Sequence, residues 1–244
     1  FPTRRSSDLA PMEKADGTRV TREKGTPQGG VISPLLANLY LHFALDKWLT
    51  KYYPTINFVR YADDIVVHCR TQEEADEVLQ AIMQRLLEVG LKANTEKTQI
   101  VYCQDYRRKK FHANIMFNFL GFSFQPRGSQ SKIDNKTFVT FTPEISASGQ
   151  NKIRSEIRGV VNRSNHRLEV VELAHLLNSK IQGWINYYGL FGTRKLREVL
   201  TLIDSRLVVW LKMKHKCSFR KARHMLSIIQ CKNPFLFKHW NSRY

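Results

Sequence analysis

Two adjacent aspartates, Asp63 and Asp64, lie between two short, mostly apolar runs at residues 58–61 and 65–67. These runs are rich in β-branched and aromatic residues, which predicts an antiparallel hairpin with residues 62–64 at its turn. Asp is common in turns for local hydrogen-bonding reasons, so one interpretation of the pair is a solvated turn. The other is a magnesium site, because neighbouring carboxylates repel each other without counter-charge and Mg²⁺ is usually held by one or two carboxylates.

The net charge of the chain is strongly positive, at +18 from 39 Lys and Arg against 21 Asp and Glu. An excess of this size favours a polyanionic partner, and nucleic acid is the first candidate. No apolar run approaches the ~20 residues that a membrane-spanning helix needs, so we expect no membrane partner. The four cysteines form no CxxC pair, which indicates a reducing, cytoplasmic location.

The first half of the chain shows clear signals for two helices. We expect Ser33 to be the N-cap and Pro34 the first residue of a helix that extends to Trp48. Residues 71–74 have the pattern of a capping box, and the amphipathic helix that follows is expected to stop at Gly90. Together with the hairpin, these helices predict the α+β fold class.

The second half of the chain is expected to contain strands first and helices afterwards. The expected elements are a strand at 99–103, a strand pair around 117–124, a loop at 126–135, and helices beginning near residue 152 and covering about 169–188 and 194–214. We place a domain boundary near the loop. The first nine residues look like a sequence-assembly scar and are left out of the fold prediction.

Four segments occur in a specific order: GTPQGGVISPLLAN at 25–38, YADD at 61–64, LKANTEKT at 91–98 and FLGF at 119–122. In this order they resemble the reverse transcriptases of bacterial group II introns, which are also called maturases. The region 146–188, followed by Gly189, is similar to the maturase-specific thumb. The resemblance implies a partial right-hand polymerase palm, with an antiparallel sheet plus helices, followed by a helical thumb or maturase domain.

This resemblance implies a division of the chain into five parts. They are the scar at 1–9, the C-terminal half of the palm at 10–125, a linker or β segment at 126–145, the thumb at 146–192, and a basic helical region at 193–244.

The resemblance also implies roles for individual residues. Asp63 and Asp64 would bind the catalytic Mg²⁺ ions, and Lys97 would neutralise or protonate the leaving pyrophosphate. Gln28, Gly29 and Gly30 would contact the incoming nucleotide or the template, and Tyr61 would lie near the primer end. Leu120 and Gly121 would form the primer grip.

Basic residues recur along the helix expected after residue 150, namely Lys152, Arg154, Arg158 and Arg163. A solvated helix face is the ordinary explanation of such a run. In a chain of this net charge we favour contacts with RNA or with a primer–template duplex. Tyr187 and Tyr188 either stack on unpaired bases or lie in the thumb core, and Trp184 is expected to lie in the thumb core.

The family pattern includes a third metal-binding aspartate on an earlier palm strand, together with basic fingers. Nothing between Ala10 and Gly25 matches either feature, because Asp16 lies in a hydrophilic turn. We therefore expect the chain to be an N-terminally truncated piece that does not polymerise DNA alone.

The leading functional prediction is an RNA-directed DNA polymerase with an intron-RNA maturase role. Its expected partners are intron RNA, an RNA template–DNA primer duplex, target DNA and dNTPs. The expected setting is a ribonucleoprotein in the bacterial cytoplasm, and a homodimer is one option for the oligomeric state. One alternative is a non-catalytic RNA-binding splicing cofactor. Another is a domesticated reverse transcriptase, either CRISPR-associated or of the retron type.

Overall fold

The computed structural model describes residues 12–13, 16–20, 31–130, 135–162 and 167–240. The chain forms two compact units, an N-terminal unit over residues 1–100 and a C-terminal unit over residues 101–244. Among the described residues, no helix combines the length and the apolar character needed to cross a membrane.

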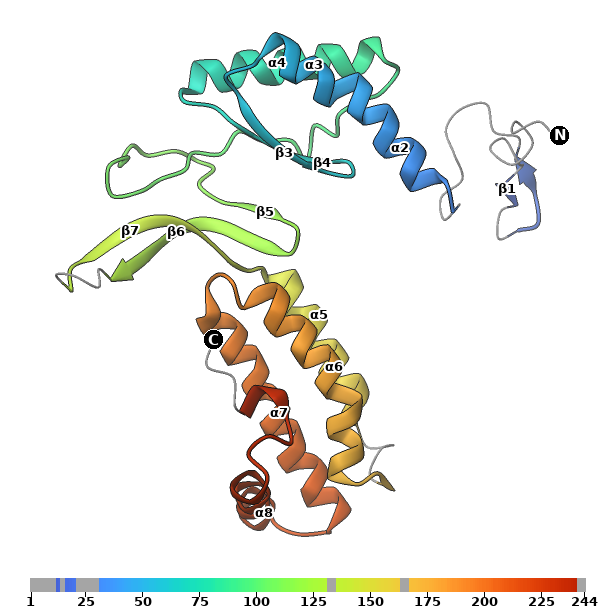
Figure 1. Ribbon diagram of the computed structural model, residues 1–244, viewed down its shortest axis with the longest axis vertical. Helices are drawn as coiled ribbons and strands as arrows, with labels where there is room; N and C mark the ends of the chain where they lie inside the picture. The colour runs from blue at the N-terminus through green and yellow to red at the C-terminus, as the bar shows by residue number, and fades with distance from the viewer. Residues whose placement is uncertain (1–11, 14–15, 21–30, 131–134, 163–166, 241–244) are drawn as a thin grey trace. The chain divides into compact units, whose positions relative to one another are not determined.

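Within its described residues, the N-terminal unit contains a hairpin, two longer helical segments and one very short strand pair (Figure 1). Its elements are β1 (Met12–Glu13), β2 (Arg19–Val20), α2 (Ser33–Leu41), the π-helical segment η1 (His42–Asp46), α3 (Lys47–Tyr52), β3 (Asn57–Tyr61), β4 (Asp64–His68) and α4 (Gln72–Glu88). The small core of this unit is formed by Leu45, Leu49, Ile56, Val78 and Ile82.

The helical segment from α2 to α3 differs from our prediction at its beginning. Ile32 is the N-cap of α2, so Ser33 and Pro34 are its first two residues and Ser33 is not the cap. Pro remains acceptable there because the first amides of a helix have no intrahelical acceptor. The described side chains of α2 are not buried, and Leu35 and Leu39 are exposed on its apolar face.

Helix α4 begins and ends where the sequence predicts. The Thr71 hydroxyl accepts a hydrogen bond from the Glu74 amide at 3.1 Å, and the Glu74 carboxylate accepts one from the Arg70 amide at 2.5 Å. Glu74 thus reaches one residue further back than in a standard capping box. At the other end Gly90 adopts φ 72°, and the Leu91 amide donates to the Leu86 carbonyl in a Schellman arrangement.

The C-terminal unit begins with an antiparallel sheet in the order β5-β6-β7. Its strands are β5 (Phe117–Phe119), β6 (Phe122–Gln130) and β7 (Thr137–Ile145). The predicted strand pair at 117–124 is confirmed. The loop predicted at 126–135 is wrong for residues 126–130, because Pro126 pairs with Phe141 inside the β6–β7 ladder and β6 extends to Gln130, whereas residues 131–134 lie outside the described residues. Proline is tolerated there because β5 ends at the level of residue 124, which leaves one side of β6 without a neighbouring strand.

The strand predicted at 99–103 is also wrong. This segment is irregular in the structure, and the Tyr102 amide donates one backbone hydrogen bond to Asn114 at 2.9 Å. An apolar run becomes a strand only where a neighbouring strand continues the ladder, and none does so here among the described residues.

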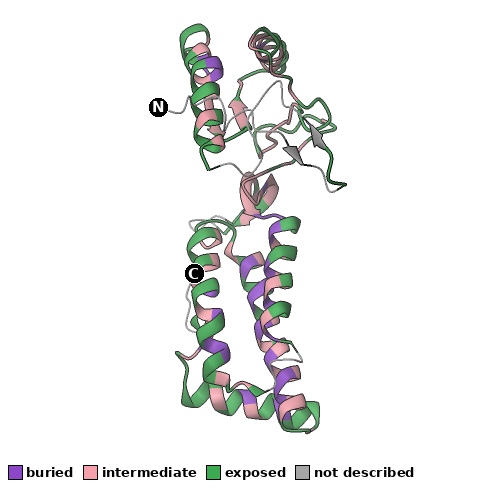
Figure 2. Ribbon diagram, turned by 90° about the vertical axis from the view of Figure 1, so that its right-hand side faces the viewer, coloured by how far each residue is buried: buried purple, intermediate pink, exposed green. Residues whose placement is uncertain are grey.

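Among the described residues, the C-terminal unit continues with four α-helices and the short 3₁₀ turn η3: α5 (Ala147–Val160), α6 (Val170–Tyr188), α7 (Thr193–Lys214), α8 (Phe219–Lys232) and η3 (Lys238–Trp240). The three helices that we predicted are confirmed. Helix α7 contacts α5, α6 and α8, and Figure 2 shows buried residues running along these long helices. Leu177, Ile181, Leu200 and Ile203 are among the fully buried side chains of this core. The mixture of antiparallel sheet and helices confirms the α+β fold class.

Candidate functional site

The acidic pair lies at a two-residue hairpin turn, as the sequence predicts. Strands β3 and β4 are antiparallel, and Tyr61 pairs with Asp64 across the turn formed by Ala62 and Asp63. Ala62 adopts the left-handed φ of 53°, which is unfavourable for a residue with a Cβ atom. Asp63, Asp64 and Tyr61 are all exposed. The turn therefore presents two carboxylates and one phenol to solvent.

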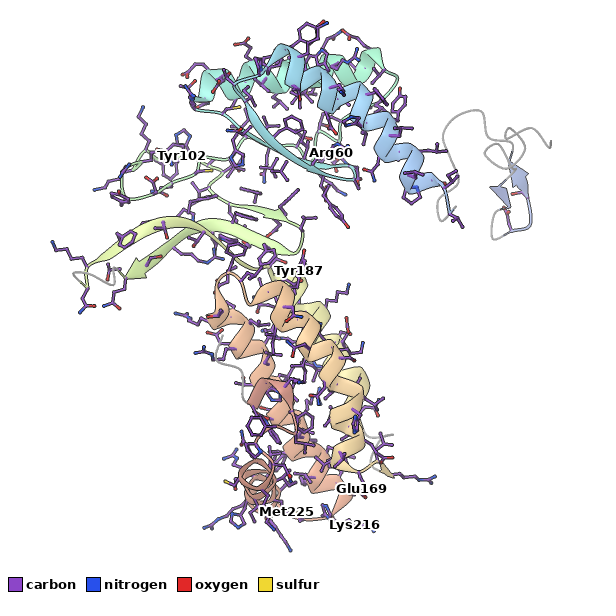
Figure 3. The ribbon with its side chains drawn as sticks, viewed as in Figure 1. Arg60, Tyr102, Glu169, Tyr187, Lys216 and Met225 are labelled. Carbon is purple, nitrogen blue, oxygen red and sulfur yellow. The ribbon has the colours of Figure 1, made fainter. Side chains whose placement is uncertain are left out.

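Arg60 connects this turn to the preceding helical segment (Figure 3). Its guanidinium donates two hydrogen bonds to the Asp46 carboxylate, both at 2.7 Å, one to the Asn38 side chain at 3.0 Å and one to the Ala62 carbonyl at 2.7 Å. The Arg60 side chain is only 10% exposed and that of Asp46 18% exposed. Arg60 therefore holds the backbone of the acidic turn through the hydrogen bond to Ala62.

The electrostatics of this ion pair are favourable. Hydrogen bonds from Arg60 lower the pKa of Asp46 below its usual value, against the opposing effect of burial. The nearby His42 ring, 3.3 Å from the same carboxylate, acts in the same direction. The π-helical turn at His42–Asp46 brings Asp46 to this position at the end of the segment.

Our sequence prediction did not include Arg60, although a signal for it exists. Arg60 and Phe58 both lie on the half-buried face of β3, two residues apart. A charged residue on the inward face of a strand needs a partner of opposite charge. The identity of that partner has no local signal, because Asp46 lies 14 residues earlier.

The two carboxylates have donor chemistry that suits a magnesium ion, because Mg²⁺ prefers oxygen ligands. In the part of the chain that the structure describes, no His, Cys, Asp or Glu completes a group of three that could hold a metal. Asp16, the other acidic residue considered, uses its carboxylate locally. Both the amide and the hydroxyl of Thr18 donate to Asp16 Oδ1, at 3.0 and 2.6 Å, and these bonds lower its pKa.

Other predicted site residues of the N-terminal unit lie outside the acidic turn. Lys97 is exposed in a turn that follows α4, and its amide donates to the Asn94 backbone and side-chain oxygens, both at 3.2 Å. Gln28, Gly29 and Gly30 lie outside the described residues.

A second two-residue turn, formed by Leu120 and Gly121, joins β5 to β6. Leu120 has φ 49° and Gly121 φ 77°, so both residues adopt the left-handed conformation typical of a tight type I′ hairpin. The Leu120 carbonyl accepts a hydrogen bond from the Tyr187 hydroxyl at 2.8 Å. The Gly121 carbonyl accepts one from the Ser146 amide, at the beginning of α5, at 2.9 Å. The turn is therefore fastened to both α5 and α6.

Tyr188 fills the space behind this turn. A Cβ atom at Gly121 would lie 2.8 Å from the Tyr188 hydroxyl oxygen, and one at Gly149 would lie 3.1 Å from it. The Tyr188 ring packs against Phe122 and against Tyr187, with centroids 5.2 and 4.8 Å apart, and burial raises its pKa. Tyr188 thus packs in the thumb core, which was the alternative to base stacking.

The neighbouring aromatic residues follow the prediction more closely. Trp184 is partly buried against the helical core, as expected. Tyr187 keeps 48% of its surface exposed, so its stacking on a base stays a prediction.

The predicted basic residues of α5 lie on its solvent side. Ile153 and Ile157 face the core, whereas Lys152 and Arg158 are exposed. Arg154 is partly buried and donates to Gln150 at 3.0 Å and to Asn151 at 3.2 Å. Arg163 lies outside the described residues.

Comparison with known proteins gives two family matches. Residues 4–124 match the reverse transcriptase (RNA-dependent DNA polymerase) family, and residues 150–226 match the group II intron, maturase-specific domain. The acidic turn and the Leu120–Gly121 turn lie within the first match, and the exposed basic residues of α5 lie within the second.

Two curated relatives extend the comparison over most of the chain. Both are the group II intron-encoded protein LtrA, one from Lactococcus lactis subsp. cremoris and one from its strain MG1363. Each is 22% identical over 319 residues, and the alignment covers 87% of this chain and 51% of the relative. The chain thus spans about half the length of the curated relatives it matches. With a reverse transcriptase match followed by a maturase-specific match, the chain belongs to the family of group II intron reverse transcriptases and maturases.

Proposed function

We propose that this chain carries the acidic half of the active site of an RNA-directed DNA polymerase encoded by a mobile group II intron, together with its intron-RNA-binding helices. The observation that supports this most directly is the pair Asp63 and Asp64 at a turn whose backbone is held by Arg60. Preorganised carboxylates need no rearrangement when charge develops in the transition state.

The reaction is attack by a primer 3′ hydroxyl on the α-phosphate of a dNTP, with release of pyrophosphate. Asp63 and Asp64 would hold Mg²⁺, which activates the attacking oxygen and neutralises charge on the phosphate oxygens. Tyr61, which pairs with Asp64 in the ladder, would contact the primer end. Lys97 would neutralise or protonate the pyrophosphate, and residues 28–30 would contact nucleotide or template.

The Leu120–Gly121 turn is proposed as the primer grip. Its contribution is positional, because a primer end held in the wrong place reacts slowly even when the metal ligands are intact. The hydrogen bonds from Tyr187 and Ser146 keep this turn in one conformation.

The first test uses the purified chain with an RNA template, a DNA primer, dNTPs and Mg²⁺. We expect no primer extension, since Asp63 and Asp64 are two ligands of a site that in this family has three. Efficient extension that is lost in Asp63→Ala would contradict this expectation and would place a complete active site within the 244 residues.

The second test uses the complete coding sequence that contains this chain. Asp63→Ala and Asp64→Ala should each abolish complementary-DNA synthesis, because either change removes a carboxylate from the metal site. Asp76→Ala, which removes an acidic residue of α4, serves as the matched control and should leave synthesis unchanged. Normal synthesis by both active-site variants would refute the proposed role of the turn.

A second function, assistance of intron splicing through RNA binding, is supported by the maturase-specific match at residues 150–226. The exposed Lys152 and Arg158, with Arg154 between them and Arg163 beyond, are the proposed RNA contacts of this region. Asp63→Ala separates the two functions, because it should abolish DNA synthesis while leaving assisted splicing intact. The proposed setting is a cytoplasmic ribonucleoprotein in which template–primer duplex and target DNA are further partners.

A further inference from the structure

A strongly basic loop projects from the C-terminal unit between Tyr102 and Asn114, and neither the acidic turn nor α5 includes it. We call residues 105–112 the basic loop. It contains four consecutive cationic residues followed by two aromatic rings: Arg107, Arg108, Lys109, Lys110, Phe111 and His112.

The base of the basic loop is well fixed. The Tyr102 and His112 rings stack with centroids 4.0 Å apart, and the Tyr102 amide donates to the Asn114 carbonyl at 2.9 Å. The Tyr106 amide donates to the Val139 carbonyl of β7, also at 2.9 Å. Figure 3 labels Tyr102 at this base. The loop is therefore anchored to the sheet and does not need to become ordered on binding.

Asp105 shapes the middle of the loop. Its Oδ1 accepts hydrogen bonds from the amides of Arg107 and Arg108, at 2.9 and 2.8 Å, and its Oδ2 accepts two from the Arg108 guanidinium. The Arg107 guanidinium lies 5.0 Å from the centre of the Tyr106 ring. These contacts use the two arginines within the loop and leave the next three residues to solvent.

The side chains at the tip of the loop, residues 109–111, are exposed. Phe111 is 95% exposed, although it is one of the largest apolar side chains of the chain. Lys109 and Lys110 are exposed, and within the described residues neither ammonium group has an ion-pair partner. An exposed ring beside unpaired cations matches the way proteins bind single-stranded nucleic acid, where a base stacks on the ring and phosphates contact the cations.

We propose that the tip of the basic loop binds an unpaired nucleic-acid strand, with Phe111 stacking on a base and Lys109 and Lys110 contacting the adjoining phosphates. The proposal concerns binding alone and does not depend on polymerase activity. A nucleic-acid strand is favoured over an anionic membrane because the exposed rings of the loop, Tyr106 and Phe111, are separated by four cationic residues and do not form an apolar face.

The experiment measures binding of the full chain to fluorescent single-stranded RNA, to DNA of the same sequence, to a blunt duplex and to phosphatidylserine vesicles, over a series of salt concentrations. Phe111→Ala should weaken single-strand binding about tenfold, with the salt dependence unchanged. Lys109→Ala/Lys110→Ala should reduce the slope of log K against log salt by about 1.4, at about 0.7 for each phosphate that the variant no longer neutralises. Phe111→Trp should retain the affinity, and its emission should be quenched on binding.

Matched controls lie elsewhere on the surface. Phe235→Ala removes a ring that is 73% exposed, and Lys92→Ala/Lys232→Ala removes two other exposed charges; we expect little change from either. The loop variants should fold normally, since the tip is exposed, and circular dichroism checks this.

Three results would overturn the proposal. They are unchanged single-strand affinity in both loop variants, an equal loss of affinity for the blunt duplex, and a loss confined to phosphatidylserine vesicles. If the loop variants lose affinity for single-stranded RNA alone, or for both single-stranded RNA and DNA, the proposal is supported, and the result shows which kind of strand the loop binds.

Discussion

The Ala62–Asp63 and Leu120–Gly121 hairpin turns have the same length but are held in place by different kinds of interaction. Each forces a non-glycine residue into the left-handed region, Ala62 at φ 53° and Leu120 at φ 49°. The acidic turn is held by the guanidinium of Arg60, in a charged network that leaves its tip exposed. The Leu120–Gly121 turn is held by tyrosines and by close packing.

The difference matches the task proposed for each turn. A turn that binds metal has to expose its carboxylates. Other residues can therefore hold only its backbone and the strand residues next to it. A turn that positions a primer by its backbone can be packed from behind. The acidic turn should therefore be sensitive to loss of charge, and the Leu120–Gly121 turn to changes in volume.

The largest expected effect comes from Gly121→Ala. The new Cβ atom would lie 2.8 Å from the Tyr188 hydroxyl oxygen at a residue with φ 77°. Left-handed strain and overpacking together should destabilise the C-terminal unit by roughly 2–4 kcal/mol. Hydrogen exchange of backbone amides in the full chain measures this.

Two further variants separate strain from packing. Gly90→Ala has similar strain, at φ 72°, but its Cβ atom would meet no atom within 4 Å, so the N-terminal unit should lose only about 1 kcal/mol. Adding Tyr188→Phe to Gly121→Ala should restore part of the lost stability, because the clashing hydroxyl is removed. Equal losses in Gly90→Ala and Gly121→Ala would show that the packing behind the turn is unimportant.

Arg60→Ala should have the next largest effect. It leaves the Asp46 carboxylate without its main partner and the Ala62 carbonyl without a donor, which should destabilise the N-terminal unit by roughly 2–3 kcal/mol. Hydrogen exchange at β3 and β4 is the measurement. Arg70→Ala, an exposed arginine just beyond the same hairpin, is the control. If the two variants behave alike, the charged network does not hold the turn.

Tyr187→Phe should have a smaller effect on the other turn. It removes the hydrogen bond to the Leu120 carbonyl and keeps the ring, so the loss should be about 0.5–1 kcal/mol. Faster exchange confined to residues near the β5–β6 turn would show it. Tyr52→Phe, at another exposed tyrosine, should change nothing.

The smallest expected effect is the loss of stability of the N-terminal unit when the pH is lowered. The pKa of Asp46 is lowered in the folded chain, so its contribution to stability is full above the unfolded value near 3.8 and is lost as pH falls through the folded pKa. Protection factors, which account for the slower intrinsic exchange of amides in acid, should therefore fall more at β3 and β4 than at β5 and β6. The excess should disappear in Arg60→Ala, and persistence of the same pH dependence in that variant would assign it to another group.

Much of the fold was predictable because its signals are local. The Asp63–Asp64 hairpin follows from mostly apolar runs on both sides of a polar turn, and α4 follows from a threonine cap and a glycine stop. The errors arose where a local signal depends on a neighbour. Residues 99–103 have strand composition but no pairing strand among the described residues, and Pro126 is in a strand because one side of β6 has no partner there.

The sequence by itself determined the family, the order of the motifs, the two turns and most helix boundaries, since each depends on residues close together in the chain. Only the tertiary structure decided what holds those turns. Arg60 meets Asp46 across 14 residues, and Tyr187 meets Leu120 across 67. Contacts of such separation have no periodicity or cap to reveal them, because they exist only after packing has brought distant segments together.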